Sequence, residues 1–228
     1  MQSALIVLEG AEGVGKTTQA RRLIGAFVEQ GIRAEHMREP GGTLLGESIR
    51  SVLLEPERAI TARAEALLFM ASRAQLVSER IRPALADGTV VVLDRFFLST
   101  YAYQIHGRKL PEVEVRAANQ LALGGLIPTV TVVLRLPGSD GMERAALRAG
   151  HDYMEQLGDD FHSRVRNAFD EFVTPVWQAA HPESGPLVCV DATGSEDCVF
   201  ERITTALTVV VPQLGVALGG ARARGEVQ

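Results

Sequence analysis

The chain has little lysine, little cysteine and no long uninterrupted apolar run. Only two of its 23 basic residues, Lys16 and Lys109, are lysines. The two cysteines, Cys189 and Cys198, have neither a metal-ligand spacing nor a redox spacing, and they are too few for a disulfide scaffold. Polar residues, proline and glycine interrupt the apolar stretch 203–218, so we expect a buried helix there and not a membrane span.

An excess of positive charge is also lacking. The formal net charge is −5 over 228 residues, which does not favour binding to nucleic acid or to an anionic membrane. An anionic substrate would therefore need a local cluster of cations. The first ten residues have no basic start and no A-x-A cleavage site, so we expect no signal peptide and, by elimination, a cytoplasmic protein.

Short apolar runs bounded by turn residues alternate with longer segments of helical periodicity, a pattern typical of βαβ units. The predicted strands are 4–8, 34–38, 89–94, 129–136 and 187–191. The predicted helices are 16–30, 43–54, 62–86, 99–106, 112–124 and 164–180, with a last helix from Glu196. Five strands and their connecting helices predict a three-layer α/β/α sandwich around a mainly parallel sheet.

The length of the chain fits a single domain, which we expect to extend from residue 1 to residue 214. Within it, residues 137–160 combine several glycines with aspartate and arginine, and we expect them to form a mobile lid. Residues 215–228 are rich in glycine, alanine and arginine, which predicts a flexible tail.

A glycine-rich loop follows the first predicted strand and opens the first predicted helix. Residues 10–17 read Gly-Ala-Glu-Gly-Val-Gly-Lys-Thr, a complete match to the phosphate-binding pattern G-x-x-x-x-G-K-[ST]. In such a loop, backbone N–H groups surround phosphate oxygens, Lys16 would reach the β- and γ-phosphates, and Thr17 would offer its hydroxyl to Mg²⁺. The predicted site for ATP and Mg²⁺ consists of Gly10, Ala11, Glu12, Gly13, Val14, Gly15, Lys16, Thr17 and Thr18.

The loop alone does not identify the reaction. GTPases share it, but they also need a guanine-reading N-K-x-D, which begins at neither Asn119 nor Asn167. Residues 191–194 spell the D-x-x-G of a GTPase switch, yet they follow the last predicted strand, so we treat this match as chance.

The third predicted strand ends in Asp94 and Arg95. At the carboxyl edge of a parallel sheet, Asp94 would lie beside the phosphate loop, where a carboxylate can hold Mg²⁺ through a water. The planar guanidinium of Arg95 would face the phosphate of an acceptor. A strand-end salt bridge without chemistry is the alternative, and the phosphate loop makes it the weaker one.

Three segments, in their order along the chain, resemble the thymidylate kinase family of the bacterial type. They are residues 9–18, residues 38–43 with the sequence Arg-Glu-Pro-Gly-Gly-Thr, and Asp94-Arg95 followed by residues 98–104. The resemblance covers about residues 5–210. It implies a P-loop fold, transfer of the γ-phosphate of ATP to dTMP with Mg²⁺, and a homodimer.

The resemblance also implies roles on the acceptor side. The family residue matching Phe69 stacks on thymine and the one matching Arg73 reaches the base edge, whereas helical periodicity alone would place Phe69 in a core. The acceptor phosphate would be bound by Arg38 and Arg95. The remaining implied contacts are Glu12 with the 3′-hydroxyl, Thr100 and Gln104 with the base or sugar, and Tyr103 as a wall against a ribose 2′-hydroxyl. Whether the Glu39–Pro40 peptide is cis stays open.

The predicted lid departs from the family pattern. Some eukaryotic members have an arginine at Gly13, and bacterial members compensate with lid arginines, but Tyr153 stands here where the pattern has arginine. We therefore expect Arg148 to supply the missing cation, and the alternatives are Arg144, Arg164 and Arg166.

Two other functions stay open at this point. A deoxynucleoside kinase, or another nucleoside monophosphate kinase, would share the fold and the phosphate loop, and an assay with nucleoside and monophosphate acceptors separates these. A nucleotide-binding regulatory switch would instead hydrolyse ATP slowly without an acceptor. Comparing turnover with dTMP against acceptor-free hydrolysis tests that alternative.

Overall fold

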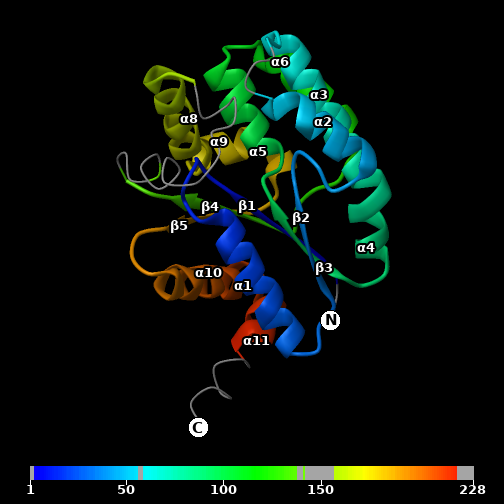
Figure 1. The fold of residues 1–228 in the computed structure, drawn as a ribbon. Coiled ribbons are helices and arrows are strands. Elements are labelled where there is room, and N and C mark those ends of the chain that lie inside the picture. The colour runs from blue at the N-terminus through cyan, green and yellow to red at the C-terminus, as the bar shows by residue number, and fades with distance from the viewer. Residues whose placement is uncertain (1–2, 56–58, 138–140, 142–156, 220–228) are drawn as a thin grey trace.

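The computed structural model describes residues 3–55, 59–137, 141 and 157–219. Their strands form one sheet in the order β2-β3-β1-β4-β5 (Figure 1), and every neighbouring pair is parallel. The strands are β1 (Ala4–Glu9), β2 (Ala34–Arg38), β3 (Val90–Asp94), β4 (Val130–Arg135) and β5 (Leu187–Asp191). Each predicted strand is confirmed to within one residue at either end.

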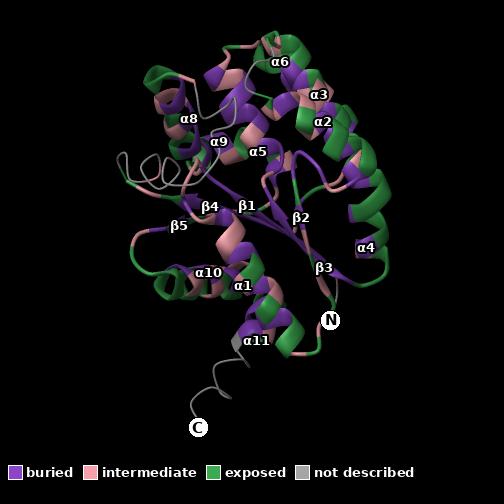
Figure 2. Cartoon of the chain, in the orientation of Figure 1, coloured by how far each residue is buried: buried purple, intermediate pink, exposed green. Residues whose placement is uncertain are grey.

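Alternate residues of the strands enter two separate hydrophobic cores, because successive side chains of a strand point to opposite faces. On β1, Ile6 packs in one core and Val7 in the other; on β3, Val92 and Leu93 divide in the same way. Figure 2 shows the sheet buried between helices on both sides. The predicted three-layer α/β/α sandwich is confirmed.

The two faces of the sheet carry different helices (Figure 1). The face of Ile6 is covered by α1 (Lys16–Glu29), α10 (Glu196–Val210) and α11 (Pro212–Gly219). The other face carries α3 (Ala62–Leu76), η1 (Val77–Ile81), α4 (Arg82–Ala86), α5 (Phe97–Thr100), η2 (Tyr101–Gly107), α6 (Glu112–Leu123), α8 (Asp159–Phe172) and α9 (Pro175–Ala180). Two further elements belong to the described chain. Helix α2 (Leu44–Leu54) packs on α3, and η3 (Pro182–Ser184) is a single helical turn.

Prolines interrupt two of the predicted helices. The helix predicted for 62–86 contains the wide π-type turn η1, which lies just before Pro83, a residue without an N–H for the carbonyl of Glu79. The helix predicted for 164–180 is two helices, α8 and α9. They separate at Thr174, because Pro175 starts a new helix that Thr174 caps by accepting a hydrogen bond from the N–H of Trp177 at 3.3 Å.

Two helices of the structure extend into the segments predicted as lid and tail. Helix α8 begins at Asp159, inside the segment predicted as a lid, and α11 continues to Gly219, five residues beyond the expected domain end at 214, because Leu218 is buried. Arg144, Arg148 and Tyr153 lie outside the described residues.

Among the described helices, none combines the length and apolar character that a membrane crossing needs.

The register of the sheet brings three chain segments to one edge. Leu8 of β1 and Arg38 of β2 are both Cα partners of Asp94 on β3. Because parallel strands end at a common edge, the loop after β1, the turn after β2 and the turn after β3 meet there.

Candidate active site

The phosphate loop closes around its own lysine. Gly10 and Gly15 have φ angles of 135° and 91°, and a Cβ at Gly10 would lie 2.4 Å from the carbonyl oxygen of Leu134. Nζ of Lys16 donates to the carbonyl oxygens of Gly10 at 3.0 Å and Ala11 at 2.6 Å. The glycines thus permit a loop that surrounds a single cation at the start of α1.

The electrostatic environment of Lys16 is adapted to an anionic ligand. Its pKa is lowered to about 7, chiefly by burial and then by the positive charge of Arg95, while Asp94 and Glu12 oppose the shift. A phosphate beside Nζ would add negative charge and favour the protonated lysine.

The side-chain oxygens of Thr17, in the first turn of α1, and Asp94, at the end of β3, lie next to each other. Oγ1 of Thr17 donates to Oδ2 of Asp94 at 2.5 Å. Hydroxyl and carboxylate oxygens are ligands that Mg²⁺ accepts. Within the described part of the chain, no three His, Cys, Asp or Glu side chains converge on one point. The pair therefore fits an ion that takes its other ligands from phosphate and water.

A buried carboxylate that sequence reasoning left without a role holds the turn after β3. Glu9, fully buried, accepts hydrogen bonds from the N–H of Phe96 at 2.8 Å and from the N–H and hydroxyl of Ser99 at 3.1 and 2.6 Å. Burial raises the pKa of Glu9, against the effect of Ser99 and Arg95. Within the turn, Arg95 has a φ of 66° and its Nη1 donates to the Gly10 carbonyl and the Ser99 hydroxyl, both at 3.2 Å.

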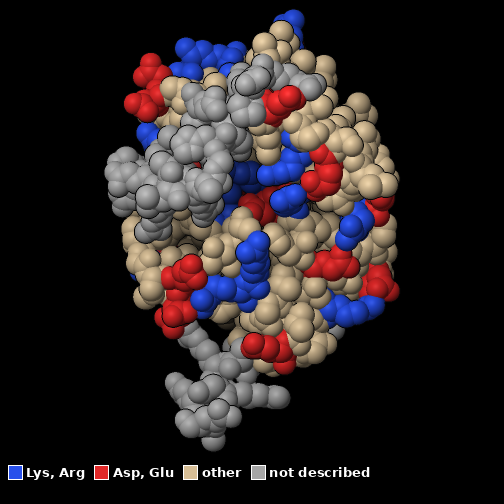
Figure 3. Space-filling view, viewed as in Figure 1, with Lys and Arg blue, Asp and Glu red and all other residues tan. Residues whose placement is uncertain are grey.

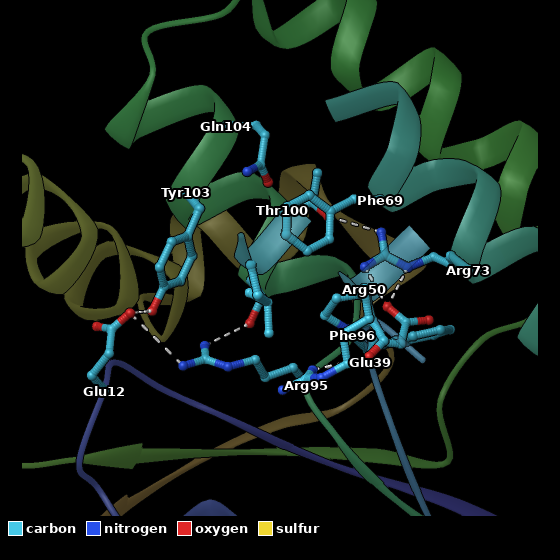
Figure 4. A pocket seen from close by; sticks show the side chains of 13 residues that line it. Glu12, Glu39, Arg50, Phe69, Arg73, Arg95, Phe96, Thr100, Tyr103 and Gln104 are labelled. Carbon is cyan, nitrogen blue, oxygen red and sulfur yellow. Dashed lines mark hydrogen bonds and ion pairs between the residues drawn. The ribbon is translucent and has the colours of Figure 1, made fainter. Parts of the chain in front are cut away.

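Two adjoining cavities lie over this edge of the sheet. The smaller, about 130 Å³, is lined by Glu12, Glu39, Pro40, Arg50, Leu54, Phe69, Arg73, Arg95, Phe96, Ser99, Thr100, Tyr103 and Gln104 (Figure 4). The larger, about 500 Å³, is lined by Glu12, Gly13, Gly15, Lys16, Thr17, Arg21, His36, Met37, Arg38, Glu39, Gly42, Arg50, Arg80, Asp94 and Arg95. Figure 3 shows basic and acidic side chains gathered in a hollow on this face.

The two cavities are joined, because Glu12, Glu39, Arg50 and Arg95 line both. The smaller cavity brings together the residues predicted on the acceptor side, apart from Arg38. The larger one contains Arg38 with the predicted phosphate and metal residues. Phe69 is half-buried and faces the smaller cavity, a position that periodicity alone could not distinguish from a core position.

The remaining predicted residues lie close by or are used elsewhere. Ala11 and Val14 border a third cavity, of about 430 Å³, whose lining includes Arg166. Thr18 is half-buried in the first turn of α1. Arg164 donates to the carbonyl oxygens of His106 and Gly107 at 3.1 and 2.9 Å, so its guanidinium is engaged with the backbone of η2.

Arg73 is the centre of a buried polar network. Its Nε and Nη2 donate to Oε2 of Glu39 at 2.8 and 2.5 Å, and its Nη1 donates to Oγ1 of Thr100 at 2.9 Å and Oδ1 of Asn119 at 2.6 Å. The side chain is only 2% exposed. Arg73 therefore joins α3 to the turn after β2, to α5 and to α6, besides lining the smaller cavity. The Glu39–Pro40 peptide in that turn is cis.

Glu12 stands between the two cavities with partners on both oxygens. Tyr103 donates to Oε1, and Nη2 of Arg95 lies 3.9 Å from the same oxygen (Figure 4). Nδ1 of His162 lies 3.7 Å from Oε2. Burial alone would raise the pKa of Glu12, but His162, Arg95 and Tyr103 outweigh it and lower the pKa to about 2. The carboxylate is therefore charged at neutral pH.

Several arginines at the site were missed by sequence reasoning. Arg50 of α2 lines both cavities and donates from Nη1 to the carbonyl oxygen of Pro40 at 3.0 Å. Arg21 and Arg80 line the larger cavity. In the sequence, each of these arginines lies in a helical segment and looks like an ordinary solvent-exposed charge. Only the return of α2 over the turn after β2 brings Arg50 to the site.

Replacing the buried Arg73 tests this network. We expect Arg73→Met to lower the free energy of unfolding by about 3–5 kcal/mol, because it leaves the Glu39 carboxylate buried without its cation. Burial already raises the pKa of Glu39 and Arg73 opposes that shift, so the variant should raise this pKa further. The folded variant then binds more protons than the unfolded chain, and its stability should increase as the pH falls from about 7 to 5.

Urea denaturation at several pH values measures the effect. A Glu39→Gln/Arg73→Met double variant is the control, since it lacks the titrating group and should lose the added pH dependence. An Arg73→Met variant with the stability and pH profile of the wild type would contradict the network.

Comparison with known proteins agrees with this geometry. The family model described as thymidylate kinase matches residues 8–203. The thymidylate kinase of Chlorobium chlorochromatii is 42% identical over 210 residues, which are 87% of this chain and 91% of that protein. The thymidylate kinase of Synechococcus sp. (strain JA-2-3B'a(2-13)) is 43% identical over 215 residues, 94% of this chain and 98% of that protein. That of Deinococcus radiodurans is 42% identical over 207 residues, 91% and 97% of the two chains. The chain thus belongs to the thymidylate kinase family.

Proposed function

We propose that the protein transfers the γ-phosphoryl group of ATP to dTMP, giving dTDP and ADP, in the cytoplasm. The observation that carries this proposal is the junction of the two cavities at Glu12, Arg50 and Arg95. One cavity begins at the phosphate loop and the other ends at an aromatic ring, so a donor triphosphate and an acceptor monophosphate would meet where the cations are shared.

The acceptor needs no strong general base. A phosphate monoester is already an anion near neutral pH, so the enzyme must position it and neutralise the charge that accumulates between the two nucleotides. Arg95 lies at the junction and Lys16 lines the larger cavity, so both can contribute to that neutralisation. Thr17, with Asp94 through a water, would hold Mg²⁺, which supplies further positive charge beside the β- and γ-phosphates.

The smaller cavity supports a pyrimidine deoxynucleotide as the acceptor. Phe69 offers a ring face for the base, and Thr100, Gln104 and Arg73 offer polar atoms around its edge. Glu12 would accept the 3′-hydroxyl, and Tyr103, fixed by its hydrogen bond to Glu12, would leave no room for a 2′-hydroxyl. Arg148, which lies outside the described residues, stays our proposed lid cation.

A deoxynucleoside acceptor fits the site less well. Transfer to a sugar hydroxyl needs a carboxylate placed to take its proton. Here Arg38, Arg50 and Arg95 line the larger cavity, and a phosphorylated acceptor beside the donor triphosphate adds negative charge that these cations can neutralise. The two carboxylates that line both cavities, Glu12 and Glu39, are hydrogen-bonded to Tyr103 and to Arg73.

The donor side is tested by removing the loop lysine. Lys16→Ala should lower kcat by about a hundredfold or more, because the contact with the transferred phosphoryl group is lost, while the thermal midpoint should change little. The other lysine, Lys109, is exposed with a φ of 58°, so Lys109→Asn is a matched control that should keep full turnover. A coupled assay of ADP release measures both. Near-normal transfer by Lys16→Ala would exclude this role for the loop.

The acceptor side is tested at Phe69. Phe69→Ala should weaken dTMP binding by about 1–3 kcal/mol, the usual contribution of stacking between a base and an aromatic ring, and leave ATP binding unchanged. Leu44, 91% exposed on α2, gives the control Leu44→Ala. Calorimetric titration with dTMP, dCMP, dGMP and UMP measures affinity and selectivity. Equal dTMP affinity in wild type and Phe69→Ala would return Phe69 to a structural role.

We also propose that the protein is a homodimer formed through the outer faces of α3 and α6. Leu67 of α3 and Val113 and Leu121 of α6 are 62%, 81% and 85% exposed, and α3 packs beside α6. Exposed large apolar side chains on adjacent helices are costly unless they are covered.

Sedimentation velocity at micromolar concentration tests the dimer. The wild type should sediment as a dimer and Leu121→Glu as a monomer, because a buried unpaired carboxylate opposes association. Val209, 77% exposed on α10, provides Val209→Glu as a control that should remain dimeric. A monomeric wild type, or a dimeric Leu121→Glu, would show that this face is not the interface.

A further inference from the structure

A buried histidine outside the cavity linings faces the carboxylate that we assign to the acceptor sugar. His162 is only 1% exposed and lies in the first turn of α8. Its Nδ1 is 3.7 Å from Oε2 of Glu12, whereas Tyr103 and Arg95 approach Oε1. The two oxygens of Glu12 thus have different surroundings: Tyr103 and Arg95, which line the smaller cavity, on one side, and α8 on the other (Figure 4).

The position of His162 is fixed by contacts that do not involve Glu12. Its ring packs edge-on against Phe161, with centroids 5.5 Å apart. Phe161 in turn packs against Tyr103 at 6.1 Å, and it lies so close to Gly107 that a Cβ there would be 2.5 Å from Cε2 of the ring. Arg164 ties the same turn of α8 to the carbonyls at the end of η2.

Glu12, in contrast, lies in the phosphate loop between β1 and α1, and not in a helix or a strand. Its cavity-side partners, Tyr103 and Arg95, are also the residues that the acceptor is expected to contact. A ligand that engages them competes for their hydrogen bonds. His162 is the partner that a bound acceptor would leave in place, since it does not line either cavity at the junction.

We infer that His162 is a positioning residue for the acceptor sugar: it holds the Glu12 carboxylate from behind, in the orientation that accepts the 3′-hydroxyl. This inference depends on the proposed function, because Glu12 must contact that hydroxyl. A separation of 3.7 Å is longer than a hydrogen bond, but an N–H on Nδ1 at that distance still attracts the carboxylate electrostatically. The low pKa of Glu12, to which His162 contributes more than either Arg95 or Tyr103, agrees with this arrangement.

The test combines variants of His162 with an acceptor that lacks the hydroxyl. Wild type should bind dTMP about tenfold more tightly than its 3′-deoxy analogue, the usual scale for a hydrogen bond to a charged group. His162→Phe keeps an aromatic ring but removes the ring nitrogens. It should lower the affinity for dTMP about tenfold, to that of the analogue, and leave the affinity for the analogue and the KM for ATP unchanged.

Two further variants keep the test decisive if His162→Phe does not fold. Asparagine places an amide near the position of Nδ1, whereas glutamine carries it one bond farther out, near Nε2. His162→Asn should therefore retain the preference of the wild type for dTMP, and His162→Gln should lose it. Calorimetric titration measures the affinities, and thermal melting confirms that each variant is folded.

The outcomes separate the two ideas. If the His162 variants bind dTMP and the 3′-deoxy analogue more weakly to the same extent, His162 only supports the fold. If His162→Phe and His162→Gln both keep the tenfold preference of the wild type for dTMP over the analogue, His162 does not position Glu12. Either result overturns the inference and leaves the kinase proposal standing. A wild type that binds both acceptors equally would instead overturn the sugar contact of Glu12, and with it the role of His162.

Discussion

The buried carboxylate of Glu9 is the interaction on which the geometry of the site depends. It lies at the end of β1, directly before the phosphate loop, and accepts three hydrogen bonds, one from Phe96 in the turn after β3 and two from Ser99 of α5. The same turn carries Arg95, whose guanidinium returns to the Gly10 carbonyl of the loop. Donor loop and acceptor turn are therefore joined twice, once through the buried acid and once through the arginine. Since the parallel register already places Leu8 beside Asp94, little conformational freedom is left between the two halves of the site.

The charges of the site are balanced by pairing cations with acids that differ in burial. Arg73 is held by a fully desolvated Glu39, while Arg38 is paired with Glu47 on the surface, where its Nη2 lies 3.1 Å from Oε2 and both side chains are about half exposed. A surface pair of that kind contributes little and can be exchanged for a phosphate. A buried pair cannot be exchanged without leaving a charge uncompensated. The arrangement thus divides the arginines into those that form the walls and those free to turn to the ligand.

The sequence predicted the sheet, the phosphate loop and the Thr17–Asp94 pair because each depends on contiguous residues. A strand, a glycine-rich turn and the end of the next buried strand carry their geometry locally, and the parallel sheet brings them together. The acceptor side could not be derived in this way. Phe69, Thr100 and Gln104 come from different helices, and periodicity gives the same signal for a residue lining a cavity as for one in a core. Their grouping came from family resemblance, and the structure shows that they line one cavity.

The residues that were missed share a physical reason. Arg50 looks like a solvated helix charge and His162 like a polar residue of an amphipathic helix. Each becomes important only because a helix returns to the sheet edge, α2 over the turn after β2 and α8 against η2. The helix break at Thr174 differs from these cases, because Pro175 is a local sequence signal for it. The apolar residues keep their helical spacing across that proline, so periodicity alone predicts one continuous helix. The proline ring breaks the helix through a backbone constraint that periodicity does not detect.

Polar side chains that line the smaller cavity are held by hydrogen bonds to other side chains in the absence of a ligand. Arg73 is held by Glu39, Thr100 and Asn119, and Gln104 donates to Oε1 of Glu65 at 2.9 Å, an acid that Arg108 also binds. Such networks fix the side chains in one arrangement, so a ligand does not have to order them. A base of the wrong shape would have to break a buried hydrogen bond to fit. In the base site that we propose, selectivity would follow from the cost of disturbing the side chains that line the cavity, as well as from the contacts that the correct base gains.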